Sequence, residues 1–515
     1  MNKFLLMLIP LIGFTPISMA QTADNALLFS QQNYGSTARS KAMGNAFGAL
    51  GGDFGSLSIN PAGIGIFQRS EISTTLSLLN LNTTESTYQG NSAKDDQNRM
   101  NIQNFGYATM VPIHKPFSGL ISFNFGIGCN RLANFNQNTS MSIESSPYSR
   151  MDAFVQNTNG INYYNLINSE ENNPYTGSVP WESILAWENY LIDVTNSDTD
   201  GNQYTTFLLE NEKVKQRETA NHEGYINEYL TAFGLNFNHR LYLGASLGVQ
   251  NLYYNETKTY AEIGMDEIGT NLKSWGQFNY TNNSSTSGLG FNFKIGAIYR
   301  PIPTLRIGIA IHTPTLFKIK KIFRSEMNST LTGIGVEADG SHEEKSPTGK
   351  DVYHFHTPFR AIGSIAYQID RKGILSADLE LADYSSSKYS NGLGGDNFGT
   401  ENGEIKNTFK AVANIRIGGE YKLTEAVSLR GGLELMGNPY QPYAFGISQP
   451  NMNFHFRTYN GGYGYRSGRY SFDLTYGLGD KTNFMYPYLI DGVDVDPVKY
   501  HTYTHEILFT FGMRI

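Results

Sequence analysis

The chain has 515 residues, a formal net charge of −7, and 53 Gly, 33 Tyr and 31 Phe. The acidic balance and the lack of a dense basic run argue against a nucleic-acid partner. A mean hydropathy of −0.36, with no run of about 18 apolar residues after the N-terminus, argues against membrane helices. The single Cys129 excludes an internal disulfide. A closed hydrogen-bonded β-barrel would hold such a chain together, and a secreted all-β protein is the alternative.

The first 20 residues have the pattern of a secretory signal peptide. Lys3 precedes an apolar stretch from Phe4 to Ile17, and Ser18 and Ala20 supply the small residues that precede a cleavage site. A transmembrane anchor, the alternative, needs about 20 apolar residues and seldom carries this cleavage pattern. We therefore expect export and cleavage after Ala20.

The segment that follows, residues 21–69, does not alternate as a membrane strand does. Between residues 35 and 66 it is rich in Gly and Ala, which allow backbones to approach closely. It contains an Asn60-Pro61 turn, in which the proline biases Asn60 away from the helical conformation. By composition it is either an irregular periplasmic extension or a plug that folds into the lumen of a following barrel.

Beyond residue 69 the sequence alternates between apolar and small or polar side chains, as strands with one face toward lipid do. In residues 289–299 the odd positions are apolar, from Leu289 to Tyr299, whereas the even ones include Gly290 and Lys294. The even positions would face the lumen. The segments with this pattern are 70–79, 102–111, 118–128, 228–238, 241–250, 289–299, 305–311, 361–369, 375–383, 411–421, 427–435, 456–466, 470–478 and 503–515.

The inferred lumen positions carry charges of both signs. Such a set predicts a salt-bridged interior, although some of the basic residues could instead meet a ligand carboxylate. The charged positions are Lys294, Arg306, Arg416, Arg430, Arg514, Asp378, Glu380, Glu420, Glu434, Asp473 and Glu506.

The links between these segments alternate in length. Short links lie at 112–117, 239–240, 300–304, 370–374, 422–426 and 467–469, and long ones at 80–101, 129–227, 251–288, 312–360, 384–410, 436–455 and 479–502. Outer-membrane barrels have short periplasmic turns and long extracellular loops, whereas a secreted sandwich has no reason to segregate them. The sequence therefore predicts an all-β fold, a transmembrane antiparallel β-barrel of about 14 strands in the bacterial outer membrane, with both termini periplasmic.

The longest link has apolar residues at roughly helical spacing between positions 181 and 192, which predicts a short amphipathic helix outside the membrane. Its apolar face would consist of Trp181, Ile184, Leu185, Trp187 and Leu191. The functional interpretation is a lip that captures apolar ligand at the cell surface. The alternative is a helix that packs the loops together, which is the more common role of such a stripe.

Two histidines form a weak candidate metal site. His354 and His356 lie two residues apart and would share one face of an extended segment, so they could hold a metal ion or a haem iron. They fall in a predicted extracellular loop, and the sequence offers no third ligand nearby. We therefore expect no metal and no other cofactor.

A further motif has the spacing of a hydrolase nucleophile, Gly244-Ala245-Ser246-Leu247-Gly248. That motif requires a strand, a sharp turn and a helix. Here an alternating strand continues through the motif to Val249. We therefore expect that the chain is not an enzyme.

The N-terminal segment also resembles a known family. Its stretch Ala42-Met43-Gly44, its run Gly51-Gly52-Asp53 and above all Asn60-Pro61-Ala62-Gly63 are similar to the N-terminal hatch of the FadL/OmpP1/TodX outer-membrane transporters. More particularly, they resemble the Bacteroidetes branch often labelled hemin receptor. Pro314 and the stretch Thr357-Pro358-Phe359-Arg360 agree with the resemblance, which covers essentially the whole mature chain.

The resemblance implies a monomeric barrel of residues 70–515, plugged by a hatch of residues 21–69, that takes up hydrophobic small molecules passively. Long-chain fatty-acid-like compounds are the implied ligands, with hemin as a second option, and outer-membrane lipid is the other implied partner. Carried over to this chain, the ligand-binding or gating motif of the hatch is Asn60, Pro61, Ala62 and Gly63. A barrel partner or assembly factor of a secretion system is the alternative function.

Overall fold

The structure is a computed structural model, and the predicted signal peptide lies outside the residues that it describes. The described residues are 23–34, 36–113, 119–195, 200–209, 212–265, 274–392, 398–442, 444, 454–490, 492–493 and 495–515.

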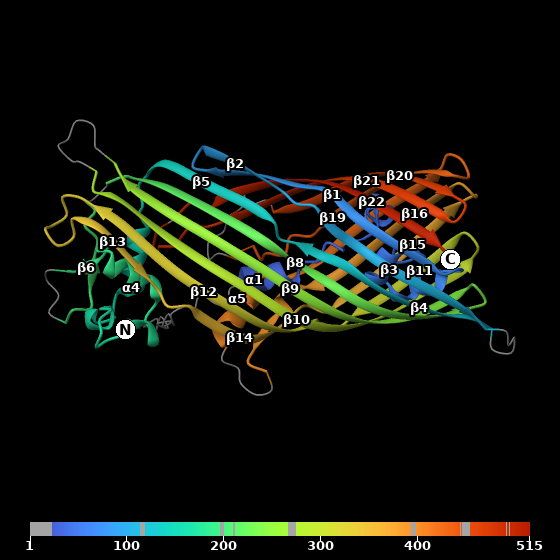
Figure 1. Cartoon of the computed structure of the whole chain (residues 1–515), viewed down its shortest axis with the longest axis horizontal. Helices are drawn as coiled ribbons and strands as arrows, with labels where there is room; N and C mark the ends of the chain where they lie inside the picture. The colour runs from blue at the N-terminus through green and yellow to red at the C-terminus, as the bar shows by residue number, and fades with distance from the viewer. Residues whose placement is uncertain are drawn as a thin grey trace, which may run out of the picture.

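The wall of the molecule is a closed antiparallel barrel (Figure 1). Its last strand pairs with its first, from Glu71↔Arg514 to Thr87↔Lys499, and so closes the ring. The ring has 14 strands, each of which coincides with one predicted segment, so the predicted fold class is confirmed. The ring strands are β1 (Glu71–Tyr88), β3 (Asn101–Pro112), β4 (Leu120–Asn134), β8 (Val214–Phe237), β9 (Leu241–Gly264), β10 (Gly276–Ile302), β11 (Leu305–His312), β15 (Arg360–Ile369), β16 (Gly373–Asp383), β18 (Ala411–Lys422), β19 (Val427–Met436), β20 (His455–Ser467), β21 (Tyr470–Met485) and β22 (Val498–Arg514).

The two faces of the ring strands differ as the alternation predicts. On β10, the side chains of Leu289, Phe291 and Phe293 are 44–50% exposed, whereas those of Asn292 and Lys294 between them are buried. An apolar outer surface around a polar interior is the arrangement of a barrel that spans the outer membrane. The short turns lie at the same end of the barrel as the C-terminus (Figure 1). For example, β21 begins directly after the short turn 467–469, and its first residue pairs with the end of β22.

At the opposite end the wall extends well beyond the predicted segments. There β8, β9 and β10 are 24, 24 and 27 residues long. The strands here run past the predicted segments, because residues 281–287 are polar on both faces, so the alternation is lost while the backbone ladder continues. The added strands are β2 (Asn91–Asn98), β5 (Gln137–Ser146), β12 (Leu316–Leu331), β13 (Gly340–Lys345), β14 (Gly349–His356) and β17 (Lys388–Ser390).

A small cap lies at this loop end, on the left of Figure 1. It consists of α3 (Arg150–Thr158), η4 (Tyr163–Asn165), η5 (Pro174–Thr176), α4 (Trp181–Glu188), β6 (Asp193–Val194) and β7 (Tyr204–Thr205). Ser149 and Asp152 form a capping box at the start of α3, and burial raises the pKa of the Asp152 carboxyl. Phe154 of the cap is buried against Phe278 and Tyr280 of β10. The cap is therefore packed onto the upper wall.

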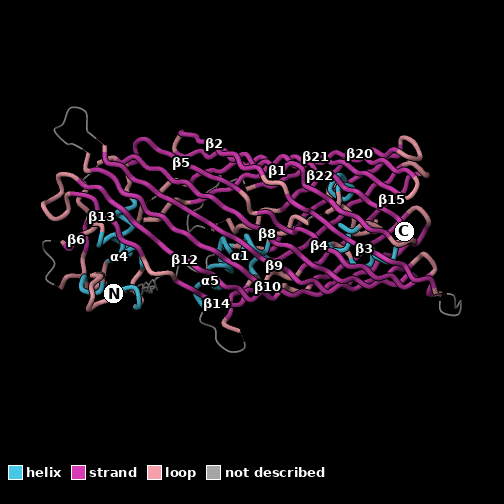
Figure 2. The backbone as a smooth tube through the Cα atoms, viewed as in Figure 1, coloured by secondary structure: helices cyan, strands magenta, loops and turns pink. Residues whose placement is uncertain are grey.

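The segment before β1 lies inside the barrel, where Figure 2 shows short helices within the cage of strands. We call residues 23–67 the hatch. It contains α1 (Ala23–Ser30), α2 (Ala38–Ala42), η1 (Phe54–Ser58) and η2 (Pro61–Ile66), and two further elements, η6 (Tyr384–Ser386) and α5 (Gly399–Thr408), join β16 to β18. Among the described residues, no helix is long and apolar enough to cross a membrane.

Candidate functional site in the barrel lumen

Asn60 joins the hatch to the barrel wall. As the N-cap of η2, its Oδ1 accepts a hydrogen bond from the Ala62 N–H at 3.0 Å. Its Nδ2 donates to the Gly48 carbonyl oxygen at 2.7 Å, and to the carbonyl oxygens of Ala297 on β10 and Ile309 on β11 at 3.3 Å each. One amide thus links two hatch segments to two wall strands.

The remaining residues of the motif pack at close range. A Cβ on Gly244 of β9 would lie 2.4 Å from the Pro61 carbonyl oxygen and from the Ala62 nitrogen, so only glycine fits this position. The Gly63 carbonyl oxygen accepts from the Gly52 N–H at 3.0 Å. The hydrolase-like motif that begins at Gly244 therefore lies within an uninterrupted strand, and its first glycine serves to seat the hatch.

Glycines on the lumen face of many wall strands repeat this arrangement. A Cβ on any of them would come within 2.0–2.7 Å of a hatch atom. The hatch can therefore approach the wall closely over most of the circumference. These seat glycines are Gly106, Gly126, Gly234, Gly244, Gly296, Gly308, Gly418, Gly432 and Gly462.

Replacing one seat glycine should loosen the hatch. In Gly296→Val the new Cβ would lie 2.0 Å from Asn60 Oδ1, so we expect the docking of η2 to weaken by about 1–3 kcal/mol, as overpacking does elsewhere. Hydrogen exchange of the Ala62 and Gly63 amides measures the effect. Gly363→Val on β15 is the matched control, because nothing lies within 4 Å of a Cβ there. Equal exchange in both variants would contradict the role of the seat.

Ion pairs also tie the hatch to the lumen face. Arg39 of α2 lies 3.1 Å from Glu420 of β18, and Lys41 lies 3.0 Å from Glu434 of β19. Arg430 of β19 binds the same Glu420 at 2.6 Å. Three of the predicted charged positions, Glu420, Arg430 and Glu434, thus belong to ion pairs in the lumen that include the hatch.

A second charge cluster lies at the level of α1. Glu380 of β16 is bonded to Arg360 at 2.6 Å and to Arg416, and all three side chains are at most 5% exposed. The Tyr34 hydroxyl of the hatch donates to Glu380 at 2.8 Å, and Arg360 also donates to the Ser30 carbonyl oxygen at the end of α1. Glu380 therefore holds three wall strands, β15, β16 and β18, and the hatch together.

α1 occupies an aromatic chamber at mid-height in the lumen. The ring of Phe29 lies 6.2 Å from Phe135, 5.9 Å from Tyr254 and 6.4 Å from Phe355. Leu27 is buried in the same cluster, and α1 also packs against α5. Because these side chains are mostly apolar, withdrawal of α1 would open an aromatic-lined volume suited to an apolar ligand.

One seam of the ring lacks a continuous backbone ladder. The β3–β4 ladder ends at Asn104↔Asn130, and among the described residues β2 and β5, which continue these strands, are not paired with each other. The Ser140 hydroxyl of β5 donates to Asp95 of β2 at 2.5 Å, and Gln137 Nε2 of β5 donates to the hydroxyls of Thr84 on β1 and Thr502 on β22 at 3.0 Å each. The wall is held here by side chains, which separate more easily than paired backbones.

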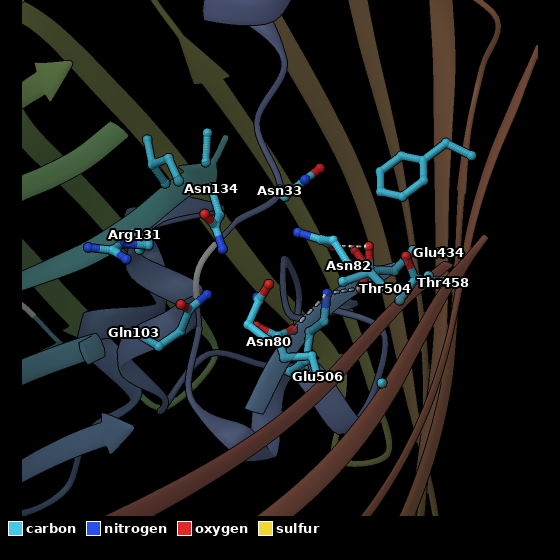
Figure 3. Close-up of a pocket in the computed structure, with 16 residues that line it drawn as sticks. Asn33, Asn80, Asn82, Gln103, Arg131, Asn134, Glu434, Thr458, Thr504 and Glu506 are labelled. Carbon is cyan, nitrogen blue, oxygen red and sulfur yellow. Dashed lines mark hydrogen bonds and ion pairs between the residues drawn. The ribbon is translucent and has the colours of Figure 1, made fainter. Parts of the chain in front are cut away.

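A polar cavity of about 110 Å³ lies behind this seam (Figure 3). Leu132 and Ala133 of β4 belong both to its lining and to the aromatic cluster, so the cavity and the chamber adjoin. Arg131 donates to the Asn227 amide oxygen at 3.2 Å. The polar lining comprises Asn33, Lys41, Asn80, Asn82, Gln103, Arg131, Asn134, Glu434, Thr458, Thr504 and Glu506.

The predicted capture helix is α4 of the cap. Ile184, Leu185 and Leu191 are fully buried in the cap core. The Trp181 ring lies 5.1 Å from Phe323, and Trp187 is partly buried near Tyr204. This burial favours the interpretation that the helix packs the loops together, and ligand capture by its apolar face stays a hypothesis.

The two candidate histidines lie on β14, so their predicted location in a loop is wrong. They share one face with the exposed Val352, as expected for an extended segment. The alternate residues Tyr353 and Phe355 are buried, so the face with the histidines points outward. In the part of the chain that the structure describes, no convergent group of three metal-ligating side chains includes His354 or His356.

Comparison with known proteins finds no matching family model and no matching curated protein. Solved structures do match. A Pseudomonas aeruginosa FadL homologue has a TM-score of 0.53 at 12% identity, over 93% of this chain and 98% of that chain. The P. putida toluene transporter TodX has a TM-score of 0.50 at 11% identity, over 94% and 99%. A TodX deltaS2 mutant has a TM-score of 0.55 at 12% identity, over 94% and 99%. The likeness at these identities concerns the fold.

Proposed function

We propose that this chain, which has the fold of the FadL and TodX outer-membrane transporters, admits hydrophobic small molecules passively through its lumen. The observation that carries the proposal is the aromatic chamber around α1, which adjoins a wall seam without a backbone ladder. An apolar ligand gains most when it leaves water for such a chamber. Because the hatch fills the lumen, the ligand must displace α1 to enter.

The route we infer runs from the cap into the chamber and out through the seam. The chamber and the polar cavity meet at Leu132 and Ala133 of β4. A ligand that moves past them reaches the gap above Asn104↔Asn130, where only side-chain contacts would need to part. The hatch motif around Asn60 would hold the turn end closed and direct the ligand sideways.

The lining of the two spaces suggests an amphipathic ligand. The chamber offers Phe29 and its aromatic neighbours to an apolar body, and the cavity offers Arg131 and Asn134 to a polar head. A carboxylate can accept charge-assisted hydrogen bonds from such donors. A long-chain fatty-acid-like compound therefore fits best, and hemin, which also carries carboxylates, is the second ligand to test.

Locking the seam tests this route. The Ser140 hydroxyl of β5 donates to the Asp95 carboxylate of β2 at 2.5 Å across the seam, so Asp95→Cys with Ser140→Cys should form a disulfide there. The free Cys129 is replaced by serine in all strains. We expect the oxidised barrel to lower the uptake of radiolabelled long-chain fatty acid to the level of a deletion strain, and reduction to restore it.

Two controls separate the route from the function. Each single-cysteine variant should transport with and without reductant, which excludes an effect of oxidation itself. Uptake that is unchanged in the deletion strain would contradict transport of this ligand class, and hemin uptake is then measured in the same strains. Uptake that is lost on deletion but unaffected by the lock would contradict only the seam as the exit.

A further inference from the structure

Three side chains converge at a place remote from the lumen site, on the outer face of the wall. His455, Asp480 and His501 belong to β20, β21 and β22, which are consecutive in the ring. In the strand register both histidines stand opposite Thr482, and Asp480 lies two residues from it on the same face. Their potential donor atoms all lie within 4.8 Å of one another.

The alternation of the strands places this cluster outside the barrel. Tyr459 shares its face with His455, Tyr476 with Asp480, and Tyr503 with His501, and these three tyrosines are 38–47% exposed. The side chains of the cluster itself are 23–28% exposed. His455 is the first residue of β20 and His501 lies near the start of β22, at the loop end of the wall, so an ion can reach the cluster from the external solution without entering the lumen.

The distances already approach those of a metal site. His501 Nε2 lies 2.7 Å from Asp480 Oδ1, and His455 Nε2 lies 3.3 Å from the same oxygen. In a tetrahedral zinc site, metal–ligand bonds of about 2.0–2.2 Å place the donor atoms about 3.4 Å apart. The cluster would need to open by less than about 1 Å to admit the ion.

The barrel does not need these three side chains for its ladder. The backbone pairing of β20, β21 and β22 continues through all three positions. Two imidazole nitrogens and one carboxylate oxygen are the three-ligand set found in zinc sites that keep a fourth position open. Imidazole ligands favour late transition metals, whereas Ca²⁺ and Mg²⁺ prefer oxygen ligands alone.

We propose that His455, Asp480 and His501 bind one divalent late transition metal ion, such as Zn²⁺ or Cu²⁺, on the outer surface of the barrel. The ion would link three neighbouring strands next to the closure of the ring with β1. Its fourth position faces outward, where water can occupy it. This site is independent of the proposed transport route.

Binding of the ion must compete with protons. An imidazole binds a metal ion only in its neutral form, so acidification should weaken Zn²⁺ binding. The other charged or titratable groups that face the cluster are Arg457, opposite Asp480 in the register, Glu85 of β1, opposite His501, Lys499, two residues from His501 on the same face, and Tyr503, whose ring lies 4.4 Å from His501. The positive charges of Arg457 and Lys499 disfavour a bound cation, and the carboxylate of Glu85 favours it.

Calorimetric titration of the untagged, metal-stripped barrel with ZnCl₂ in detergent tests the proposal. We expect one Zn²⁺ per chain at pH 7.5 and no binding of Ca²⁺. Loss of an outer-sphere partner of a metal commonly costs about 10–100-fold in affinity, so loss of a ligand in His501→Gln or Asp480→Asn should cost at least about tenfold. Cobalt(II) absorption gives a second readout, because its intensity reports coordination by the protein.

The matched control is His505→Gln. His505 lies on the same strand and the same outer face as His501, but it is bonded to the Tyr476 hydroxyl at 2.8 Å. This variant should bind Zn²⁺ as the parent does. Absence of stoichiometric binding in the parent, or an equal loss in His505→Gln, would overturn the site. Heat-modifiable migration on gels verifies that each variant is a folded barrel.

Discussion

A barrel that lacks residues 21–66 should insert into membranes and conduct small ions freely. An eight-stranded barrel is filled by its own side chains, whereas 16–18 strands leave an aqueous channel. A ring of 14 strands is closer to the second case, and at the level of the hatch its lumen face is lined by seat glycines such as Gly296 and Gly432, which fill no space. Planar-bilayer conductance measures the expected opening.

The deletion leaves charges in the lumen without their hatch partners, among them Glu420 and Glu434. Water that enters the emptied lumen solvates them, so the barrel itself should remain folded. The full-length chain and Gly363→Val, whose Cβ meets nothing within 4 Å, are the controls and should stay closed. A folded deletion variant with the conductance of the full-length chain would contradict a sealing role of the hatch.

The membrane-spanning part of the fold could be predicted from the sequence because lipid imposes a strict alternation on each strand. On β10, Leu289, Phe291 and Phe293 are exposed and Lys294, which points to the opposite face, is buried, as the alternation requires. The upper wall escaped prediction for the same reason. Residues 281–287 are polar on both faces, so no alternation marks a strand that is nonetheless paired at every position.

The site was predictable only in part. The turn at Asn60-Pro61 can be recognised from the local sequence. Glycines at lumen positions such as Gly244 and Gly296 can also be seen in the sequence, but nothing near them in the chain explains why glycine is needed there. Their reason, close contact with Pro61 and Asn60, depends on a segment about 180 to 240 residues away in the chain. The aromatic chamber could not be predicted, because no local pattern brings Phe29, Phe135, Tyr254 and Phe355 together.

Neutralising Glu380 should be the most destabilising single substitution in the lumen. In Glu380→Gln the buried guanidinium groups of Arg360 and Arg416 lose the carboxylate that both bind. An uncompensated buried charge costs about 3–5 kcal/mol. We also expect release of the end of α1, since Tyr34 and Ser30 are held by this cluster. Urea unfolding followed by tryptophan fluorescence measures the loss.

The cause can be distinguished from lost packing. Gln has nearly the volume of Glu, so a cost of this size must come from charge. Replacing the whole cluster, with Glu380→Gln, Arg360→Leu and Arg416→Met together, removes the unpaired cations and should recover much of the stability, since apolar substitutes for buried ion clusters are often neutral or stabilising. Glu343→Gln, at an exposed ion pair with Lys345, should leave the unfolding midpoint unchanged. A triple variant that unfolds as early as Glu380→Gln would contradict the electrostatic explanation.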